Sequence, residues 1–285
     1  MKKYGWSELP DSIRQAVRTH IGDIADVQPT TTGQSCNFSA TVRRGSREPV
    51  FVKAVVGVSP AMRWLRNEAE AAGLAPGIAP AVLFADDIDD WLIVGFEHLT
   101  GRPAKLGPGS TDLPLIASTL ARISAVTAPT LRPLTLRWAS SWWPRLAEER
   151  PDTLGAWNLD LLSHWERQAP ERVSGDTLVH SDLHADQFII TDTESVHVID
   201  WGLPAAGAAW VDPALLVIRL IDAGHSPGEA ETWARQHTRW ADASEDDITA
   251  FAVYVAGLWT YKAAATDEIA RMARRYADWR LSTTR

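Results

Sequence analysis

The sequence predicts an α+β protein in two parts, a small β-rich part over residues 1–100 and a larger, mainly helical part over residues 101–285. Residues 49–56 form a strongly β-prone run, and residues 38–42 alternate between apolar and small or polar side chains. A stretch rich in Gly and Pro, residues 101–109, separates these strands from a chain dominated by helical patterns. We therefore expect two lobes joined by a linker.

The β-rich part begins with a short amphipathic helix, since Ile13, Val17 and Ile21 recur at helical spacing. A second helix begins after Ser59, a capping residue that Pro60 follows at the first helical position. The elements expected in this part are helix 8–25, strands 38–42 and 50–56 joined by a basic turn at 43–47, helix 59–72, and strands 81–85 and 91–96 around an acidic turn at 86–90.

Helical periodicity dominates the second part. Two of its helices begin with a capping box, in which Ser226 is followed by Glu229 and Ser244 by Asp247. A pair of strands is expected to interrupt the helices near the middle of this part. The expected helices cover residues 112–127, 141–149, 155–168, 211–223, 227–240 and 245–278.

The bulk composition is that of a soluble globular protein. The chain has 285 residues, of which 45% are hydrophobic and 22% charged, so it can bury a sizeable core. Its formal net charge of −8 argues against nucleic-acid binding and suits cationic ligands. The single cysteine, Cys36, excludes an internal disulfide. Because no apolar run is long enough for a membrane span or a signal peptide, we expect a cytoplasmic monomer or dimer without a membrane partner.

One segment contains most of the residues that suggest chemistry. Asp182 lies in a turn between two apolar runs, Gln187 follows it by 5 residues, and Asp200 follows it by 18 at the end of an apolar strand. Phosphoryl transfer needs a carboxylate that orients and deprotonates an attacking hydroxyl, and oxygen ligands that hold Mg²⁺ against the phosphates. The pattern therefore indicates a phosphoryl-transfer site.

Residues 180–187 and the Ile-Asp-Trp sequence at 199–201 resemble the catalytic and metal-binding loops of the kinase-like small-molecule phosphotransferases, specifically the aminoglycoside phosphotransferase family. That family usually has His-Gly-Asp-Leu-His-x-x-Asn, so this chain departs from the pattern at Ser181 and Gln187. The resemblance covers most of the chain. It implies a bilobal protein-kinase-like fold, with nucleotide bound in the small β-rich N-lobe and the catalytic and substrate-binding groups in the large helical C-lobe.

The resemblance assigns a role to each polar residue of these loops. Asp182 is the expected catalytic base. Asp200 and Gln187 are the expected ligands of Mg²⁺, although Gln is one methylene longer than the family's Asn, and Asp186 is the alternative to Gln187. His180 is expected to brace the loop without taking part in the chemistry.

Lys53 lies between apolar β-residues, where an unpaired ammonium is expensive to bury. In a kinase-like site this lysine binds the α- and β-phosphates and pairs with a glutamate from the following helix. Glu68 is the expected partner and Glu70 the alternative, because the two side chains project about 200° apart and only one can face the strand.

Two further segments are expected to complete the nucleotide site. Ser35 and Asn37 occupy the place of a phosphate-covering loop and could offer backbone amides, although the segment lacks the Gly-x-Gly-x-x-Gly pattern. The stretch from Glu97 through His98 to Leu99 resembles the interlobe hinge, where backbone groups bind the edge of the adenine.

The segment after the metal loop is expected to be structural. In related phosphotransferases it usually continues to a second Asp that braces the lobe, but here Leu215 and Leu216 occupy that neighbourhood. We expect Asp212 to be the N-cap of a helix that Pro213 begins.

The acceptor is not fixed by the sequence. Acidic residues of the helical part suit an aminoglycoside, whereas its many tryptophans suit a flatter acceptor such as a nucleoside or macrolide. The leading interpretation is an ATP- or GTP-dependent, Mg²⁺-dependent O-phosphotransferase that acts on an aminoglycoside or another antibiotic, in a resistance role. The alternatives are a metabolic kinase of the choline, homoserine or sugar type, and a non-catalytic nucleotide-binding protein, which Gln187 and the poor glycine loop favour.

Overall fold

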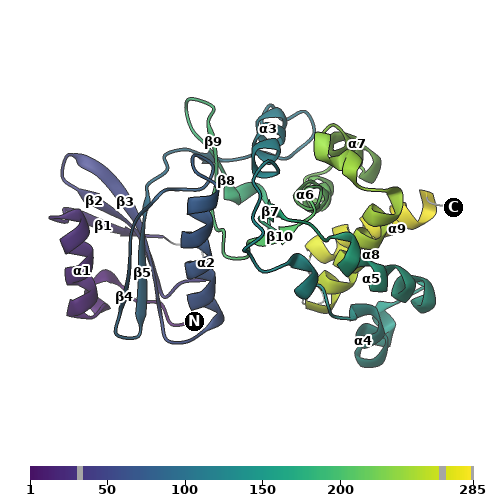
Figure 1. The fold of residues 1–285 in the computed structure, drawn as a ribbon, viewed down its shortest axis with the longest axis horizontal. Coiled ribbons are helices and arrows are strands. Elements are labelled where there is room, and N and C mark those ends of the chain that lie inside the picture. Colours follow the sequence, from purple (N-terminus) through teal and green to yellow (C-terminus); the bar gives the residue numbers. More distant parts are fainter. Residues whose placement is uncertain (31–34, 263–267, 284–285) are drawn as a thin grey trace. The chain divides into compact units, whose positions relative to one another are not determined.

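The computed structural model describes residues 1–30, 35–262 and 268–283. It divides into two compact units, here called the β-rich unit and the helical unit (Figure 1). The predicted combination of a β-rich region and a helical region is confirmed. The lobe boundaries at residue 100 remain a prediction. The β-rich unit comprises Met1–Pro103 and Asp186–Pro204, and the helical unit comprises Ala104–Ala185 and Ala205–Arg285.

A five-stranded antiparallel sheet in the order β1-β2-β3-β5-β4 forms the body of the β-rich unit. One face packs on α1 and the other on α2 (Figure 1). Successive side chains of a strand point to opposite faces, so Val52 and Ala54 belong to the core under α1, while Lys53 and Val55 face α2. The elements are β1 Asp26–Pro29, β2 Phe38–Arg44, β3 Arg47–Val56, β4 Val82–Ile88, β5 Trp91–Glu97, α1 Asp11–Ile21, α2 Pro60–Leu74 and the 3-10 turn η1 Trp6–Glu8.

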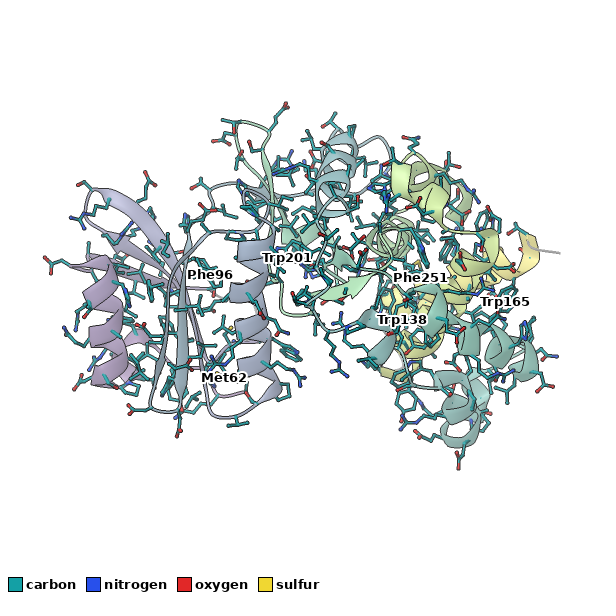
Figure 2. The ribbon with its side chains drawn as sticks, viewed as in Figure 1. Met62, Phe96, Trp138, Trp165, Trp201 and Phe251 are labelled. Carbon is teal, nitrogen blue, oxygen red and sulfur yellow. The ribbon has the colours of Figure 1, made fainter. Side chains whose placement is uncertain are left out.

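The capping signal of this unit acts as the sequence predicts, but the helix expected at 8–25 is shorter and covers Asp11–Ile21. The Ser59 hydroxyl accepts a hydrogen bond from the Met62 amide and caps α2. Met62 and Phe96 then join the core between α2 and the sheet (Figure 2). The acidic turn expected at 86–90 is shorter, because β4 continues to Ile88 in pairing with Trp91.

A second sheet, in the order β6-β8-β9, connects the segment 186–204 to the β-rich unit. Gly101 is required there, because a Cβ would lie 2.5 Å from the Ile190 carbonyl oxygen. The Val198 amide also donates to the Ile78 carbonyl at 2.8 Å. The expected linker 101–109 therefore contains a short paired strand. The strands are β6 Arg102–Pro103, β8 Phe188–Ile190 and β9 Val196–Val198, with the 3-10 turn η4 Ala185–Gln187 before β8.

The helical unit is built around α8, in which all residues from 248 to 257 are buried. Trp138 packs on Phe251 and Tyr254 of α8 at ring-centroid distances of 5.5 and 4.3 Å (Figure 2). The elements of this unit are α3 Leu113–Ile123, η2 Leu134–Leu136, α4 Trp142–Glu149, η3 Pro151–Thr153, α5 Leu159–Arg172, β7 Thr177–Val179 paired with β10 Ala205–Gly207, α6 Val211–Asp222, α7 Pro227–Arg235, η5 Thr238–Asp242, α8 Glu245–Lys262 and α9 Glu268–Thr283.

Four expected helices of this unit differ in extent. The helix expected at 112–127 ends at Ile123, and the helix expected at 155–168 is Leu159–Arg172. The continuous helix predicted for 245–278 is two helices, α8 and α9, which pack against each other; part of the predicted span lies outside the described residues. The helix predicted for 227–240 ends at Arg235. Both capping boxes are present at Ser226 and Ser244. In the described part of the chain, none of the helices combines the length and apolarity that a membrane crossing requires.

Candidate phosphotransfer site

The expected site residues fall into two sets, and the set in the β-rich unit is centred on the ammonium of Lys53. Lys53 Nζ donates to both carboxylate oxygens of Glu68, at 2.8 and 2.9 Å, and to Oδ1 of Asp200 at 2.5 Å. The strand β3 directs Lys53 toward α2, and the helix presents Glu68 to it. The structure thus brings together three of the predicted residues, with Glu68 and not Glu70 as the partner.

Charge balance fixes the protonation state of Lys53. Burial by itself disfavours the ammonium, but the charges of Glu68 and Asp200 outweigh it and raise the pKa of Lys53 above its ordinary value. Lys53 and Glu68 are buried, while 49% of the Asp200 side chain is exposed. The cluster therefore presents one accessible carboxylate beside a permanently charged lysine.

Local contacts hold the loop that places Asp200. Asp200 follows β9 in a left-handed conformation with φ of +63°, which Asp tolerates better than most residues. The next residue, Trp201, is fully buried and donates from its indole nitrogen to the Val198 carbonyl at 2.7 Å. Asn67 of α2 donates to the Gly202 carbonyl at 3.0 Å. The loop is therefore fastened to the helix that also supplies Glu68.

Gln187 lies at the end of η4, and its side chain is only 3% exposed. Its backbone carbonyl accepts from the Ile199 amide at 2.9 Å, which ties this turn to the residue before Asp200. Asp186, the alternative ligand, is exposed. The two candidate metal ligands, the Gln187 amide and the Asp186 carboxylate, therefore lie within the β-rich unit on a turn that is bonded to the segment of Asp200.

The expected phosphate-covering loop lies partly outside the described residues, since residues 31–34 are not described. Ser35 is exposed, and its hydroxyl is 3.9 Å from the Cys36 sulfur. The prediction that Asn37 offers its backbone amide is wrong, because this amide donates to the Ala54 carbonyl at 3.0 Å. The Asn37 side chain is also engaged, with Lys2 and Val56.

The expected hinge begins where β5 ends. Glu97 is the last residue of β5 that pairs with β3, and its carboxylate accepts from the Ala81 amide at 2.9 Å. His98 and Leu99 follow as partly buried residues beyond that strand pairing. Burial lowers the pKa of His98, with Arg43 acting in the same direction, so this side chain is neutral near pH 7.

The second set of residues, in the helical unit, surrounds Asp182. Asp182 follows β7 in a loop, with 48% of its side chain exposed. The amides of His180 and Ser181 donate to the two oxygens of Asp212, at 2.8 and 2.9 Å. His180 is fully buried, as expected of a residue that braces the loop. The carboxylate of Asp182, by contrast, is accessible to solvent.

The N-cap expected at Asp212 is wrong. Helix α6 begins at Val211 after the capping residue Trp210, so Asp212 lies in its first turn and turns its carboxylate to the loop of Asp182. Burial raises the pKa of Asp212 to about 6, against the two amides that favour its ionised form. Asp212 thus braces the loop from α6, whereas the expected brace was His180 alone.

Sequence reasoning also missed two arginines beside this loop. Arg137 donates to the Ser181 hydroxyl at 3.0 Å, and an Arg219 nitrogen lies 3.8 Å from Oδ1 of Asp182. A signal for Arg219 existed: it is the charged residue of the apolar stretch 213–221, and it follows Asp212 by 7 residues, or two turns. The two side chains therefore share one face of α6.

Comparison with known proteins agrees with this geometry. Residues 58–248, more than half of the chain, match the model of the phosphotransferase enzyme family. The chain belongs to this family. It is a phosphotransferase that acts on a hydroxyl group, as the loop around Asp182 predicts. No curated protein sequence matches it.

Solved structures share the fold of this phosphotransferase. A thermostable mutant of aminoglycoside phosphotransferase APH(4)-Ia, in ternary complex with AMP-PNP and hygromycin B, has a TM-score of 0.66 at 15% identity, over 96% of this chain and 99% of that one. Choline kinase LicA from Streptococcus pneumoniae has a TM-score of 0.63 at 16% identity, over 96% and 100%. The AMP-bound spectinomycin phosphotransferase APH(9)-Ia has a TM-score of 0.59 at 12% identity, over 92% and 97%. The predicted kinase-like fold is confirmed.

Proposed function

We propose that this phosphotransferase moves the γ-phosphate of ATP or GTP to a hydroxyl of a small molecule, with Asp182 as the catalytic base. The observation that carries the proposal is the ammonium of Lys53, fixed between the carboxylates of Glu68 and Asp200 in a chain of this family. A lysine that is held protonated by a buried partner is suited to bind phosphate oxygens. Backbone groups from Glu97 to Leu99 are the proposed contacts of the purine, and Ser35 is the proposed contact in the phosphate loop.

Mg²⁺ is the cation that the proposed site would hold, with Asp200 and Gln187 as its protein ligands. The donors fit, because a half-exposed carboxylate and an amide oxygen on neighbouring segments are the hard ligands that this ion prefers. Among the described residues, no three His, Cys, Asp or Glu side chains gather to hold a metal by themselves. Mg²⁺ usually takes most of its ligands from phosphates and water, and when bound it would neutralise phosphate charge.

The chain's own residues would act mainly by positioning and charge. Lys53 would offset the negative charge of the phosphates. Asp182 would orient the acceptor hydroxyl and take its proton as the oxygen attacks the γ-phosphorus and the bond to the leaving diphosphate breaks. Asp212 would keep the loop of Asp182 in place through its two amide contacts.

An aminoglycoside or another antibiotic is the first acceptor to consider, with resistance as the role. The support is the fold shared with the hygromycin B complex of APH(4)-Ia and with spectinomycin phosphotransferase APH(9)-Ia. A metabolic alcohol is the second candidate, and its support is the similar fold of choline kinase LicA. The acidic balance of the chain, with a net charge of −8, suits a cationic acceptor of either kind.

The test is nucleotide consumption across an acceptor panel. The full chain is incubated with ATP or GTP and Mg²⁺, together with hygromycin B, spectinomycin, choline, homoserine or a hexose, and nucleoside diphosphate is measured. We expect one class of acceptor to stimulate turnover in the wild type and none to do so in Asp182→Asn. Equal turnover in the two proteins would refute the role of Asp182.

A further inference from the structure

Arg219 is a charged residue near Asp182 that has no role in the proposed chemistry. It lies in α6 among residues that are almost all buried, and 19% of its own side chain is exposed. An arginine in such a helix is costly unless its guanidinium has partners. Its partners therefore indicate what it does.

Two contacts of the Arg219 guanidinium lie within the helical unit. One of its nitrogens lies 3.8 Å from Oδ1 of Asp182, an ion pair that is too long for a direct hydrogen bond. The guanidinium carbon lies 5.0 Å from the ring centroid of Trp259 on α8, within the range of a cation–π contact. Trp259 is partly buried, and its ring lies beside the guanidinium of Arg219.

The same helix therefore acts twice on one loop. Asp212, in the first turn of α6, holds the backbone of the loop through the amides of His180 and Ser181. Arg219, two turns later on the same face, approaches the side chain of the next residue, Asp182. The contact of Asp212 orders the backbone of the loop, and the contact of Arg219 places a positive charge beside the carboxylate of Asp182.

We propose that Arg219, supported by Trp259, is a positioning residue that places a positive charge beside Oδ1 of Asp182 and favours the ionised carboxylate. This inference rests on the proposed function, in which Asp182 takes the proton of the acceptor hydroxyl. The Asp182 carboxylate accepts that proton, while the hydroxyl oxygen bonds to the γ-phosphorus and the nucleoside diphosphate leaves. The positive charge of Arg219 favours the carboxylate over the carboxylic acid before each turnover.

A titration of Asp182 tests the inference without any acceptor. The full chain, labelled with carboxyl-¹³C aspartate, is titrated by NMR, and Asp182→Asn assigns the resonance by its absence. In Arg219→Met we expect the midpoint of Asp182 to move to higher pH by about half a unit to one unit, because a nearby cation no longer favours the ionised form. Arg219→Lys, which keeps the charge, should move it less, and Trp259→Leu should move it in the same direction.

Arg274→Met is the matched control, since Arg274 of α9 also stacks on a tryptophan, Trp157, at 4.8 Å. It should leave the midpoint of Asp182 unchanged. Circular dichroism confirms that each variant is folded. If Arg219→Met does not fold, Arg219→Lys and Trp259→Leu are titrated in its place. An unchanged midpoint in folded Arg219→Met, or in Trp259→Leu if Arg219→Met does not fold, would overturn the inference.

Kinetics with Mg·ATP and the acceptor that gives turnover among hygromycin B, spectinomycin and choline supply the second readout. Arg219→Met should lower kcat roughly ten-fold or more, with little change in the KM for ATP. A raised KM for ATP with unchanged kcat would contradict a positioning role. If Asp182→Asn instead keeps full turnover, the proposed function fails, and the titration still decides whether Arg219 acts on Asp182.

Discussion

Ser181 is held in a left-handed backbone conformation, with φ of +66°, immediately before Asp182. This conformation costs a residue with a Cβ roughly 1–2 kcal/mol, which explains physically why glycine suits this position. We expect Ser181→Gly to leave the free energy of unfolding within about 1 kcal/mol of the wild type, since relief of strain offsets the lost hydrogen bond from Arg137 and the greater freedom of the unfolded chain. Ser181→Val should lower it by about 2 kcal/mol.

Urea denaturation measures both changes, and Ser195→Val is the control. Ser195 is exposed and has no left-handed conformation, so its substitution should have little effect. If Val were tolerated equally at 181 and 195, the loop before Asp182 would not be constrained as described.

Gln187 is the second departure from the family pattern that sequence alone left open. If its amide oxygen binds Mg²⁺, then Gln187→Asn changes the length of a ligand and should change the half-saturating Mg²⁺ concentration of turnover several-fold. Asp186→Asn is the control at the adjacent, exposed position and should change it little. The opposite result, with an effect at Asp186 alone, would transfer the ligand role to Asp186.

The sequence predicts best the side chains whose direction depends on the periodicity of a single strand or helix. The family resemblance predicted a glutamate of the following helix as the partner of Lys53, helical spacing left Glu68 or Glu70, and the structure shows Glu68. The contacts of Asp212 and Arg219 could not be predicted in this way, because they depend on how a loop distant in sequence lies along α6. Asp212 followed by Pro213 has the local pattern of a helix start, and the tertiary contact with the loop overrides it.

Among the elements, α4 and α5 are joined by a buried carboxylate. Glu166 of α5 accepts from the amides of Trp142 and Trp143 at the start of α4, at 2.7 and 3.3 Å, where the capping residue Ser141 makes no side-chain bond. Burial raises the pKa of Glu166 to about 7, although both amides favour its ionised form. The start of α4 is therefore sensitive to pH.

The sign of the effect follows from the two protonation states. The folded pKa of about 7 exceeds the ordinary value of 4.5, so the folded protein keeps a proton that the unfolded chain loses between these values. The stability contributed by this proton is complete below pH 4.5 and is lost as pH rises to 7. We expect the wild type to lose stability relative to Glu166→Gln across this interval, and the difference to stay constant above it.

Thermal unfolding at several pH values between 4.5 and 8 measures this difference. Glu171→Gln, at an exposed position of the same helix, is the control and should give a difference from the wild type that changes little with pH. A difference between wild type and Glu166→Gln that does not vary with pH would show that Glu166 is ionised throughout.

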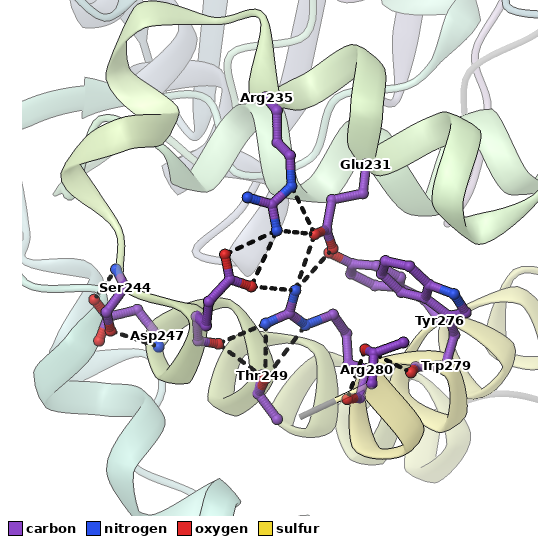
Figure 3. A network of polar contacts seen from close by, with 10 residues as sticks. Glu231, Arg235, Ser244, Asp247, Thr249, Tyr276, Trp279 and Arg280 are labelled. Carbon is purple, nitrogen blue, oxygen red and sulfur yellow. Dashed lines mark hydrogen bonds and ion pairs between the residues drawn. The ribbon is translucent and has the colours of Figure 1, made fainter. Parts of the chain in front are cut away.

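For the protein as a whole, a buried charge network secures α9 (Figure 3). Arg280 is 2% exposed and donates to Glu231 of α7 at 2.9 Å and to Glu245 of α8 at 2.8 Å. Tyr276 donates to the other oxygen of Glu231 at 2.8 Å. Removal of one partner from such a network leaves a buried charge poorly compensated, which costs more than the loss of an exposed pair.

Arg280→Met is therefore expected to lower the free energy of unfolding by about 3 kcal/mol. Arg271→Met is the matched control on the same helix, because Arg271 is exposed and pairs with exposed Glu268; it should cost at most about 0.5 kcal/mol. Chemical denaturation monitored by tryptophan fluorescence compares the two. Equal losses would mean that the network contributes no more than a surface ion pair.

The overall architecture was predictable because it rests on long, repeated patterns. Four of the five strands of the first sheet and the presence of most helices follow from alternation, helical spacing and capping residues such as Ser59 and Ser226, whereas β1 was not expected as a separate strand. The break in the span 245–278 was not predictable, because both α8 and α9 continue a helical composition and only their packing shows that they are separate. The pairing of β6 with β8 was hidden for a similar reason, since two residues are too few for a period.

Tracing the γ-phosphate tests directly whether this phosphotransferase acts on a small-molecule hydroxyl. ATP labelled in its γ-phosphate is incubated with Mg²⁺, the full chain and the stimulating acceptor, and the products are separated and weighed by mass spectrometry. We predict a labelled phosphomonoester of the acceptor, formed in equal amount to ADP, absent with Asp182→Asn, and restored to the free alcohol by phosphatase. Label found only as inorganic phosphate, at the same rate with and without each acceptor, would contradict a phosphotransferase that acts on a small-molecule hydroxyl.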